Sequence, residues 1–306
     1  MLALVAAADP PHVTLAEVPD PEPLPSEALI DVQAFSLNRG ESHSLSSKRP
    51  GDLAGWDAAG TVARAAADGS GPPVGTRVVG VKFPPGAWAQ RVAIPTTMLA
   101  ALPDAVTIQQ AATLPVAGIT ALRALEICGF LLGKRVAVTG ASGGVGRFAV
   151  QLARDAGAHV TAVARRPEGL AELGADEVVD HLAPEGEGFD AILDGVGGPV
   201  LGAAIQRVAP RGTVVSYAST ISEPVAYPTR ALFGASPGAT VHGLFVFDEL
   251  QHTQTGTSDL TRLAARIAAG HLEVHISLED SWRAAGRAVR ALLDGDVRGK
   301  AVLNVD

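Results

Sequence analysis

Cysteine is nearly absent from this chain, because Cys128 is the only one among 306 residues. A single thiol cannot form an internal disulfide or a cysteine-built metal cluster. His271 and His275 are four residues apart, but the segment from Glu273 to Ile276 alternates as a strand does, so they do not share a helix face. We therefore expect no metal site, and we expect Cys128 to be a small buried side chain.

Basic clusters and membrane-length apolar runs are also missing. The formal net charge is −8, which argues against nucleic acid or an anionic membrane as a main partner. The N-terminus lacks the basic segment of a signal peptide and is typical of a first strand, and no apolar run is long enough to span a bilayer. Since 47% of the residues are apolar, the chain can bury the cores of two domains. We expect a globular, cytoplasmic protein.

The pattern of apolar residues divides the chain into three parts. Residues 1–111 are strand-like, residues 112–247 alternate between strands and helices as in a doubly wound parallel sheet, and residues 248–306 form a tail that we expect to return to the first domain. The predicted strands are residues 29–34, 60–64, 77–81, 88–94, 135–139, 158–164, 177–180, 190–194, 213–217, 240–244, 273–277 and 301–305, and the predicted C-terminal helices are 258–269 and 281–293.

A glycine turn follows the apolar strand at residues 135–139. Ala141, Gly143 and Gly146 occupy the three small positions of an A-x-G-x-x-G variant of the dinucleotide-binding fingerprint, and a helix with apolar residues at helical spacing comes next. Small residues let the backbone turn tightly and let a pyrophosphate approach the amides of a helix N-terminus. The sequence predicts a dinucleotide site; the alternative is a glycine-rich surface turn.

No acidic residue stands at the tip of the second strand, where an NAD-specific protein usually carries one for the ribose hydroxyls. Arg165 and Arg166 stand there instead, and positive charge suits a 2′-phosphate. We therefore predict NADP(H) as the cofactor. The alternative is an NAD enzyme with two solvated arginines on a loop.

Several segments together resemble the zinc-free quinone oxidoreductase branch of the medium-chain dehydrogenase/reductase superfamily. The likeness covers nearly the whole chain, and no single segment decides it. The segments that carry it, besides the glycine turn, are residues 18–23, 34–38, 55–62, 111–121, 151–153, 173–176 and 299–303. The resemblance implies a GroES-like β-rich catalytic domain joined to a Rossmann domain that binds the cofactor, and a homodimer formed through the cofactor domain.

The resemblance also implies roles for individual residues. Asn38 is expected near the nicotinamide ribose or the substrate, and Thr120 near the nicotinamide-side phosphate. The pyrophosphate is expected to contact Gly144 and Val145. The remaining cofactor contacts that the resemblance implies are Arg165 and Arg166 at the 2′-phosphate, His181 near the adenine, and Tyr217, Ala218, Ser219 and Thr220 beside the nicotinamide.

Zinc-containing relatives hold their catalytic metal with two cysteines and a histidine, and this chain has other residues at those positions: Asn38, Trp56 and Val116. Without a Lewis acid, an alkoxide is difficult to stabilise. Hydride transfer to a conjugated acceptor is easier, because the charge delocalises onto a distant oxygen that a few hydrogen bonds can stabilise. We predict an NADPH-dependent, zinc-independent reductase of a quinone or an α,β-unsaturated carbonyl compound.

A proton must follow the hydride, and the sequence offers two candidate donors besides water. Glu41 and His43 follow Asn38 closely, in a loop expected to border the active site, and His43 is the candidate donor there. Tyr217 lies in the segment expected beside the nicotinamide. Three alternatives to the leading hypothesis stay open: an enoyl-thioester reductase of a biosynthetic pathway, a noncatalytic NADPH-binding sensor, and a zinc-independent alcohol or carbonyl oxidoreductase.

Overall fold

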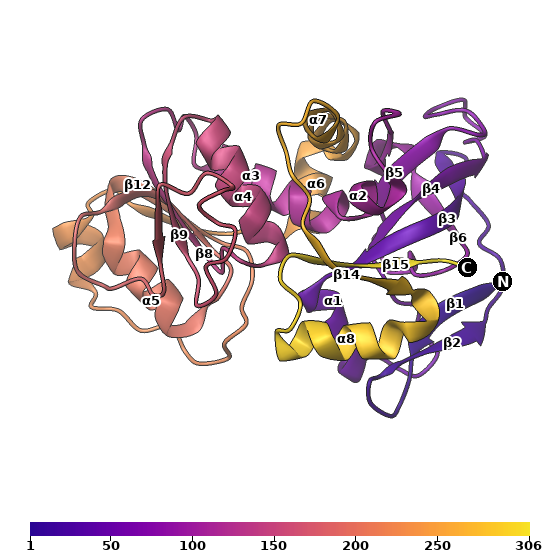
Figure 1. The fold of residues 1–306 in the computed structure, drawn as a ribbon, viewed down its shortest axis with the longest axis horizontal. Helices are drawn as coiled ribbons and strands as arrows, with labels where there is room; N and C mark the ends of the chain where they lie inside the picture. The colour runs from indigo at the N-terminus through magenta and orange to yellow at the C-terminus, as the bar shows by residue number, and fades with distance from the viewer. The chain divides into compact units, whose positions relative to one another are not determined.

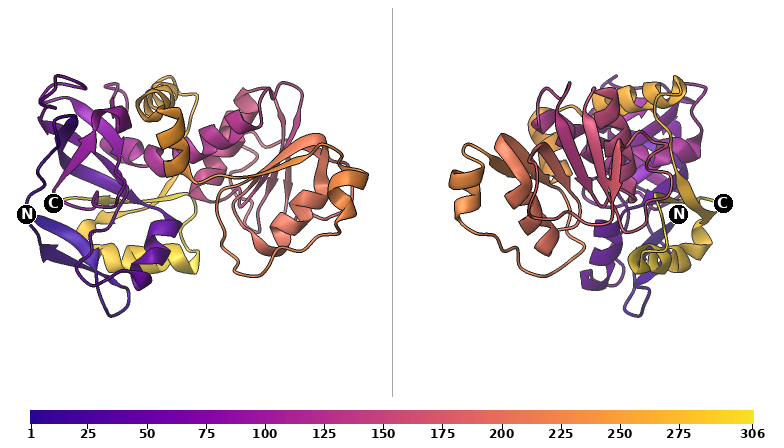
Figure 2. Two further views of the ribbon diagram at one scale, coloured as in Figure 1. Left: turned by 180° about the vertical axis from the view of Figure 1, so that it is seen from behind. Right: turned by 60° about the vertical axis from the view of Figure 1, so that its left-hand side comes forward.

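The computed structural model describes all 306 residues. The residues divide into two compact units, residues 1–119 with 250–306, and residues 120–249 (Figures 1 and 2). Two helices cross these boundaries in sequence, α3 (Ile119–Ile127) and α6 (Val246–Thr253). No helix has both the length and the apolarity that crossing a membrane requires.

The first unit contains a seven-stranded sheet and a separate β-hairpin. The sheet has the order β14-β15-β3-β4-β5-β7, with β6 also paired to β3, and the hairpin is β1-β2. The strands are β1 (Leu2–Ala6), β2 (Val13–Glu17), β3 (Glu27–Leu37), β4 (Asp57–Arg64), β5 (Arg77–Val81), β6 (Arg91–Pro95), β7 (Leu99–Ala101), β14 (Ile276–Ser281) and β15 (Lys300–Asn304). The helices are α1 (Arg39–Ser44), α2 (Ile108–Ala112), α7 (Gly256–Ala268) and α8 (Ala285–Asp294), with short helical turns η1 (Leu45–Ser47), η2 (Thr96–Met98), η3 (Leu114–Gly118) and η5 (Trp282–Ala284).

The C-terminal tail is part of this first sheet. Strand β15 pairs antiparallel with β3, so that Ala301 lies opposite Leu37, and β14 pairs with its other side. Trp282 is fully buried in the core that these strands share with the N-terminal residues. Both chain termini therefore lie in the same unit, close to each other in every view (Figures 1 and 2).

Strand β3 pairs with three other strands of this sheet, β15, β4 and β6. The register of its pairing with β4 shifts at two places. Gly60 lies at one of them. A Cβ on Gly60 would lie 2.0 Å from the carbonyl oxygen of Asp31, so only glycine allows this close approach of the two strands.

The second unit is a six-stranded sheet in which all neighbours are parallel, with the order β10-β9-β8-β11-β12-β13. Chain order reverses between β8 and β11, and right-handed crossovers then place α4 and α5 on opposite faces, as Figure 1 shows. The elements are β8 (Arg135–Thr139), α4 (Gly144–Asp155), β9 (His159–Val163), β10 (Glu177–Val179), β11 (Phe189–Asp194), α5 (Gly198–Arg207), β12 (Val208–Ser216), η4 (Ala231–Ala235) and β13 (Thr240–Gly243).

The α/β fold class expected from the sequence is confirmed, and most strands begin within a few residues of their predicted starts. Two predicted strands start too early: residues 273–275 are not strand, since β14 begins at Ile276, and residues 88–90 precede β6. The pairing of β14 with β15 starts at Ile276, opposite Lys300, so residues 273–275 precede the paired part of the chain. Similarly, Trp88 lies before β6, since its backbone bonds Leu4 and Ala54.

Candidate cofactor and catalytic site

The predicted cofactor residues of the second unit gather at one edge of its parallel sheet. The glycine turn follows β8, the two arginines follow β9, His181 follows β10, and Tyr217 follows β12. Because all six strands are parallel, their carboxyl ends share one edge, and the chain order reverses there between β8 and β11. Ligands of open α/β sheets bind at such a point.

The glycine turn has the close backbone packing that a phosphate cradle requires. Gly140 has a φ of +64°, and a Cβ on Gly146 would lie 2.5 Å from the carbonyl oxygen of Gly140 and 2.6 Å from the Cα of Ala141. Helix α4 begins at Gly144, and its N-cap Gly143 offers no side chain to the first-turn amides. These amides and the helix dipole therefore fit a pyrophosphate.

The loop after β9 presents Arg165 and Arg166 to solvent, since both side chains are exposed. The buried Arg147 of α4 supports this loop: its Nη2 donates to the carbonyl oxygen of Glu168 at 2.8 Å. His181 is exposed as well, and its Nδ1 lies 2.5 Å from Oδ1 of Asp180. The loop thus carries an exposed pair of positive charges at the sheet edge where the glycine turn lies.

Tyr217 begins the loop after β12 and packs on the turn after β11. Its N–H donates to the carbonyl oxygen of Asp194 at 3.0 Å, and a Cβ on Gly195 would lie 2.5 Å from the phenol oxygen. Burial, followed by the nearby charge of Asp194, raises the pKa of Tyr217, so the phenol stays protonated at neutral pH. The exposed Ala218, Ser219 and Thr220 continue this loop.

Thr120 lies in the first turn of α3 and is buried. It lies two residues after the η3 turn, whose residue Val116 donates its N–H to Oδ1 of Asp57 at 3.0 Å. Asp57 is fully buried and accepts this bond.

In the first unit, the side chain of Asn38 is held by three buried residues, Glu41, Asp57 and Lys300, which we call the clamp. Asn38 Nδ2 donates to Asp57 Oδ2 at 2.7 Å and to Glu41 Oε1 at 2.9 Å. Lys300 Nζ donates to Asn38 Oδ1 at 2.6 Å and to the carbonyl oxygen of Leu37 at 3.1 Å. All the polar atoms of the Asn38 amide are therefore engaged.

The clamp contains two carboxyl groups and one amine, each almost completely shielded from solvent. Burial, followed by repulsion from Asp57, raises the pKa of Glu41 well above its usual range. Its Oε2 has no hydrogen-bond partner, and an unpartnered buried charge would cost more than an unpartnered neutral acid. We therefore assign Glu41 as the neutral acid. Burial also raises the pKa of Asp57 and lowers that of Lys300, but Asp57 accepts from Ser36, Asn38 and Val116 and lies 3.8 Å from the Lys300 ammonium, so we assign Asp57 as the anion.

Lys300 is a functional candidate that the sequence reasoning did not single out, and Glu41 was noted there only for its place in the loop after Asn38. Two signals point to them: Asn38-Arg39-Gly40-Glu41 has capping-box spacing, and a lysine within the apolar strand 300–304 is unusual. His43, in contrast, lies exposed in the last turn of α1 and takes no part in the clamp. Its predicted role as a proton donor stays a prediction.

The residues at the zinc-ligand positions have other tasks here. Asn38 belongs to the clamp's hydrogen bonds, and Val116 bonds Asp57 through its backbone. Trp56 is half-buried, and a Cβ on Gly40 would contact its ring at 3.5 Å. No group of three or more histidine, cysteine, aspartate or glutamate side chains is arranged to hold a metal ion.

Cys128, at the end of α3, is half-buried, and burial raises the pKa of its thiol to about 12.

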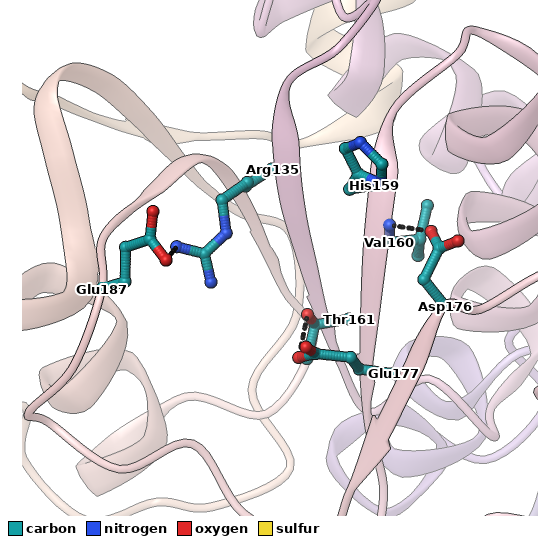
Figure 3. A pocket seen from close by; sticks show the side chains of 7 residues that line it. All are labelled: Arg135, His159, Val160, Thr161, Asp176, Glu177 and Glu187. Atoms are coloured by element: carbon teal, nitrogen blue, oxygen red, sulfur yellow. Dashed lines mark hydrogen bonds and ion pairs between the residues drawn. The ribbon is translucent and has the colours of Figure 1, made fainter.

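A cavity of about 270 Å³ lies at the other edge of the second sheet (Figure 3). It is lined by the first residues of β8, β9 and β10, with Glu187 paired to Arg135 at 2.7 Å. Since these are the amino ends of the strands, the cavity is separate from the edge that carries the glycine turn.

A parallel sheet with a glycine turn at its switch point, in one chain with a mainly antiparallel sheet, is an arrangement typical of two-domain dehydrogenases. A family model described as "Zinc-binding dehydrogenase" matches residues 173–303. A chloroplast quinone-oxidoreductase homolog of Spinacia oleracea is 35% identical over 187 residues, which cover 56% of this chain and 57% of the relative. The matched part thus spans little more than half the length of that relative.

Other matches differ in how much of the similar protein they cover. A highly reducing polyketide synthase of Arthrinium phaeospermum is 34% identical over 183 residues, 53% of this chain but 7% of that protein. The structure of a quinone oxidoreductase from Coxiella burnetii matches with a TM-score of 0.85 and 28% identity over 100% of this chain and 99% of that one. A mycobacterial protein in complex with NADPH matches with a TM-score of 0.86 and 26% identity over 99% and 100%.

The resemblance to the quinone oxidoreductase branch of the medium-chain dehydrogenase/reductase superfamily that the sequence indicated is confirmed. The comparisons also support a nicotinamide cofactor, without deciding between NAD and NADP.

Replacing Glu41 with glutamine tests its protonation state. A raised pKa means that the folded protein holds the Glu41 proton above the pKa of the unfolded chain, so stability falls as pH rises through the folded value. Glutamine has the shape of the neutral acid. We expect the free energy of unfolding of Glu41→Gln to lie within about 1 kcal/mol of the wild-type value at about pH 5, and to rise relative to the wild-type value towards about pH 8. Urea unfolding at both pH values measures this.

Glu187→Gln, at an exposed carboxylate, serves as the control and should show no such gain. A Glu41→Gln variant that is destabilised equally at both pH values would contradict the neutral assignment.

Proposed function

We propose that the protein is an NADPH-dependent reductase that transfers a hydride to a quinone or an α,β-unsaturated carbonyl compound. The observation that carries this proposal is the sheet edge at which the glycine turn, the exposed arginine pair and the Tyr217 loop come together. We retain a cytoplasmic location as the expectation.

The cofactor contacts follow from this edge. The first-turn amides of α4, including those of Gly144 and Val145, are suited to the pyrophosphate, and Thr120 would contact the nicotinamide-side phosphate. Arg165 and Arg166 favour the 2′-phosphate because a guanidinium donates paired hydrogen bonds to phosphate oxygens. The cofactor would supply the hydride, so this chain has to bind the cofactor and the acceptor, orient them, and provide the proton.

The acceptor class is inferred from the groups that could stabilise negative charge. With Asn38, Trp56 and Val116 at the zinc-ligand positions, the chain lacks there the side chains with which zinc-containing relatives hold a Lewis acid. A quinone or enone spreads the charge onto a distant oxygen, for which neutral donors suffice. The protonated phenol of Tyr217 is one such donor, with His43 and water as the alternatives.

A direct assay tests the proposal. We expect the purified protein to oxidise NADPH with 1,4-benzoquinone or with an enone, at a rate that depends on protein concentration. Absorbance at the nicotinamide band measures this. Tight NADPH binding without turnover on any quinone, enone or enoyl thioester would instead favour a noncatalytic sensor, and reversible oxidation of simple alcohols would favour an alcohol oxidoreductase.

An enoyl-thioester reductase is the second candidate, because the chain also resembles a segment of a highly reducing polyketide synthase. Crotonyl thioester distinguishes the two, since a saturated product formed faster than any quinone is reduced would favour this candidate.

Cofactor preference is tested with the double variant Arg165→Ser/Arg166→Ser. Loss of two charged donors should raise the dissociation constant for NADPH by about 10- to 100-fold and change that for NADH by less than about threefold. Fluorescence titration with both cofactors measures the ratio. Arg64→Ser, at an exposed arginine of β4, is the control. An equal loss of affinity for both cofactors would argue against a 2′-phosphate contact.

We further propose that the protein forms a homodimer through β13. This strand pairs only with β12, all four of its residues are exposed, and Val241 and Phe245 add apolar surface. Such an open edge commonly pairs with a second copy across a twofold axis.

We expect Val241→Lys to convert a dimer into a monomer in sedimentation velocity, whereas Val74→Lys, at an exposed valine of the other unit, leaves it dimeric. A monomeric wild type would overturn this proposal.

A further inference from the structure

Asn38 is the only partly exposed residue of a polar cluster that is otherwise buried. Ser36 and Asp57 are fully buried, and Glu41 and Lys300 are each 3% exposed. The cluster therefore reaches the surface of its unit only through the Asn38 side chain.

The orientation of the Asn38 amide is determined by its neighbours. An ammonium group can only donate, so the atom 2.6 Å from Lys300 Nζ must be the amide oxygen. The amide nitrogen then faces Asp57 Oδ2 and Glu41 Oε1, both of which accept. Rotating the amide by 180° would place its nitrogen against Lys300 and its oxygen against Asp57, and both contacts would become repulsive.

Both hydrogens of this amide are used within the protein. One is donated to Asp57 and the other to Glu41, whereas the oxygen accepts one bond and keeps a second lone pair. Asn38 can thus offer a ligand an acceptor and has no N–H left to offer.

Three further bonds hold the clamp itself in place. Ser36 Oγ donates to Asp57 Oδ2 at 2.6 Å, the Val116 N–H donates to Asp57 Oδ1, and the backbone N–H of Asn38 donates to Glu41 Oε1 at 2.9 Å. A network in which nearly every polar atom is satisfied resists rearrangement, so the amide is pre-organised before any ligand binds.

We propose that Glu41, Asp57 and Lys300 are positioning residues that make Asn38 a dedicated hydrogen-bond acceptor for a hydroxyl or N–H group of a bound ligand. The ligand part of this inference rests on the proposed function, whereas the clamp does not. It follows that Asn38 does not donate to a developing oxyanion, and that this task belongs to another group.

Exchanging the two partners tests the clamp. In Asn38→Asp/Asp57→Asn the carboxylate moves to position 38, where it still accepts from Lys300, and the amide at position 57 donates to it. The Val116 N–H keeps an acceptor, the Ser36 hydroxyl can rotate, and the neutral Glu41 can turn its proton towards the relocated carboxylate. The total charge stays the same.

Each single variant, in contrast, removes this complementarity. Asn38→Asp sets two carboxylates against each other, and Asp57→Asn leaves Lys300 without its anion. We expect each single variant to lower the thermal midpoint and to weaken ligand binding by about tenfold or more, and the double variant to recover to within about threefold of the wild type. Asp31→Asn, at an exposed position of β3, is the matched control.

Thermal unfolding and two binding measurements separate the outcomes. Recovery of NADPH affinity in the double variant would mean that the group donating to residue 38 belongs to the cofactor. Recovery of only the KM for the electron acceptor would mean that it belongs to the substrate, and either result supports the proposal. A double variant no more stable than the singles would overturn the clamp. Recovered stability with binding as weak as in Asn38→Asp would overturn the acceptor role. The unfolding measurement stands even where the wild type shows no reductase activity.

Discussion

The first unit depends on one buried charge, the carboxylate of Asp57. An ion removed from water costs several kcal/mol unless partners surround it. Its partners come from four places in the sequence: Ser36 in β3, Asn38 at the start of α1, Val116 in η3 and Lys300 in β15. The charge can be buried only when all four segments have converged. This requirement explains why the last strand of the chain is inserted beside one of the first.

The second unit follows a different constraint, the close approach of backbone to backbone. Gly146 lets α4 pack against the turn after β8, and Gly195 makes room for the Tyr217 ring. Neither position tolerates a Cβ, so the small residues are required by packing as much as by any ligand. The result is one sheet edge with helix amides, two arginines and a protonated phenol.

Local patterns predicted the second unit well because its signals are local. The strand-turn-helix of residues 135–155 and the arginine pair lie within short windows, and parallel strands place their carboxyl ends together without further information. The clamp could not be predicted in this way. Lys300 lies 262 residues from Asn38, and its isolated charge in an apolar strand signals burial without naming a partner. Likewise, the strand prediction at 273–275 was wrong because the start of β14 depends on where β15 pairs with it, at Ile276 opposite Lys300, a contact that exists only in the folded sheet.

Positioning an amide through buried charges has a cost and a benefit that both follow from the low local dielectric. Breaking any one bond leaves an unsatisfied polar group away from water, which is more unfavourable than the same loss at the surface. The same penalty makes alternative amide rotamers rare, so Asn38 presents one face at all times. A protein that reduces conjugated acceptors by orientation and a few hydrogen bonds gains from such fixed geometry, since little reorganisation is then needed when charge develops.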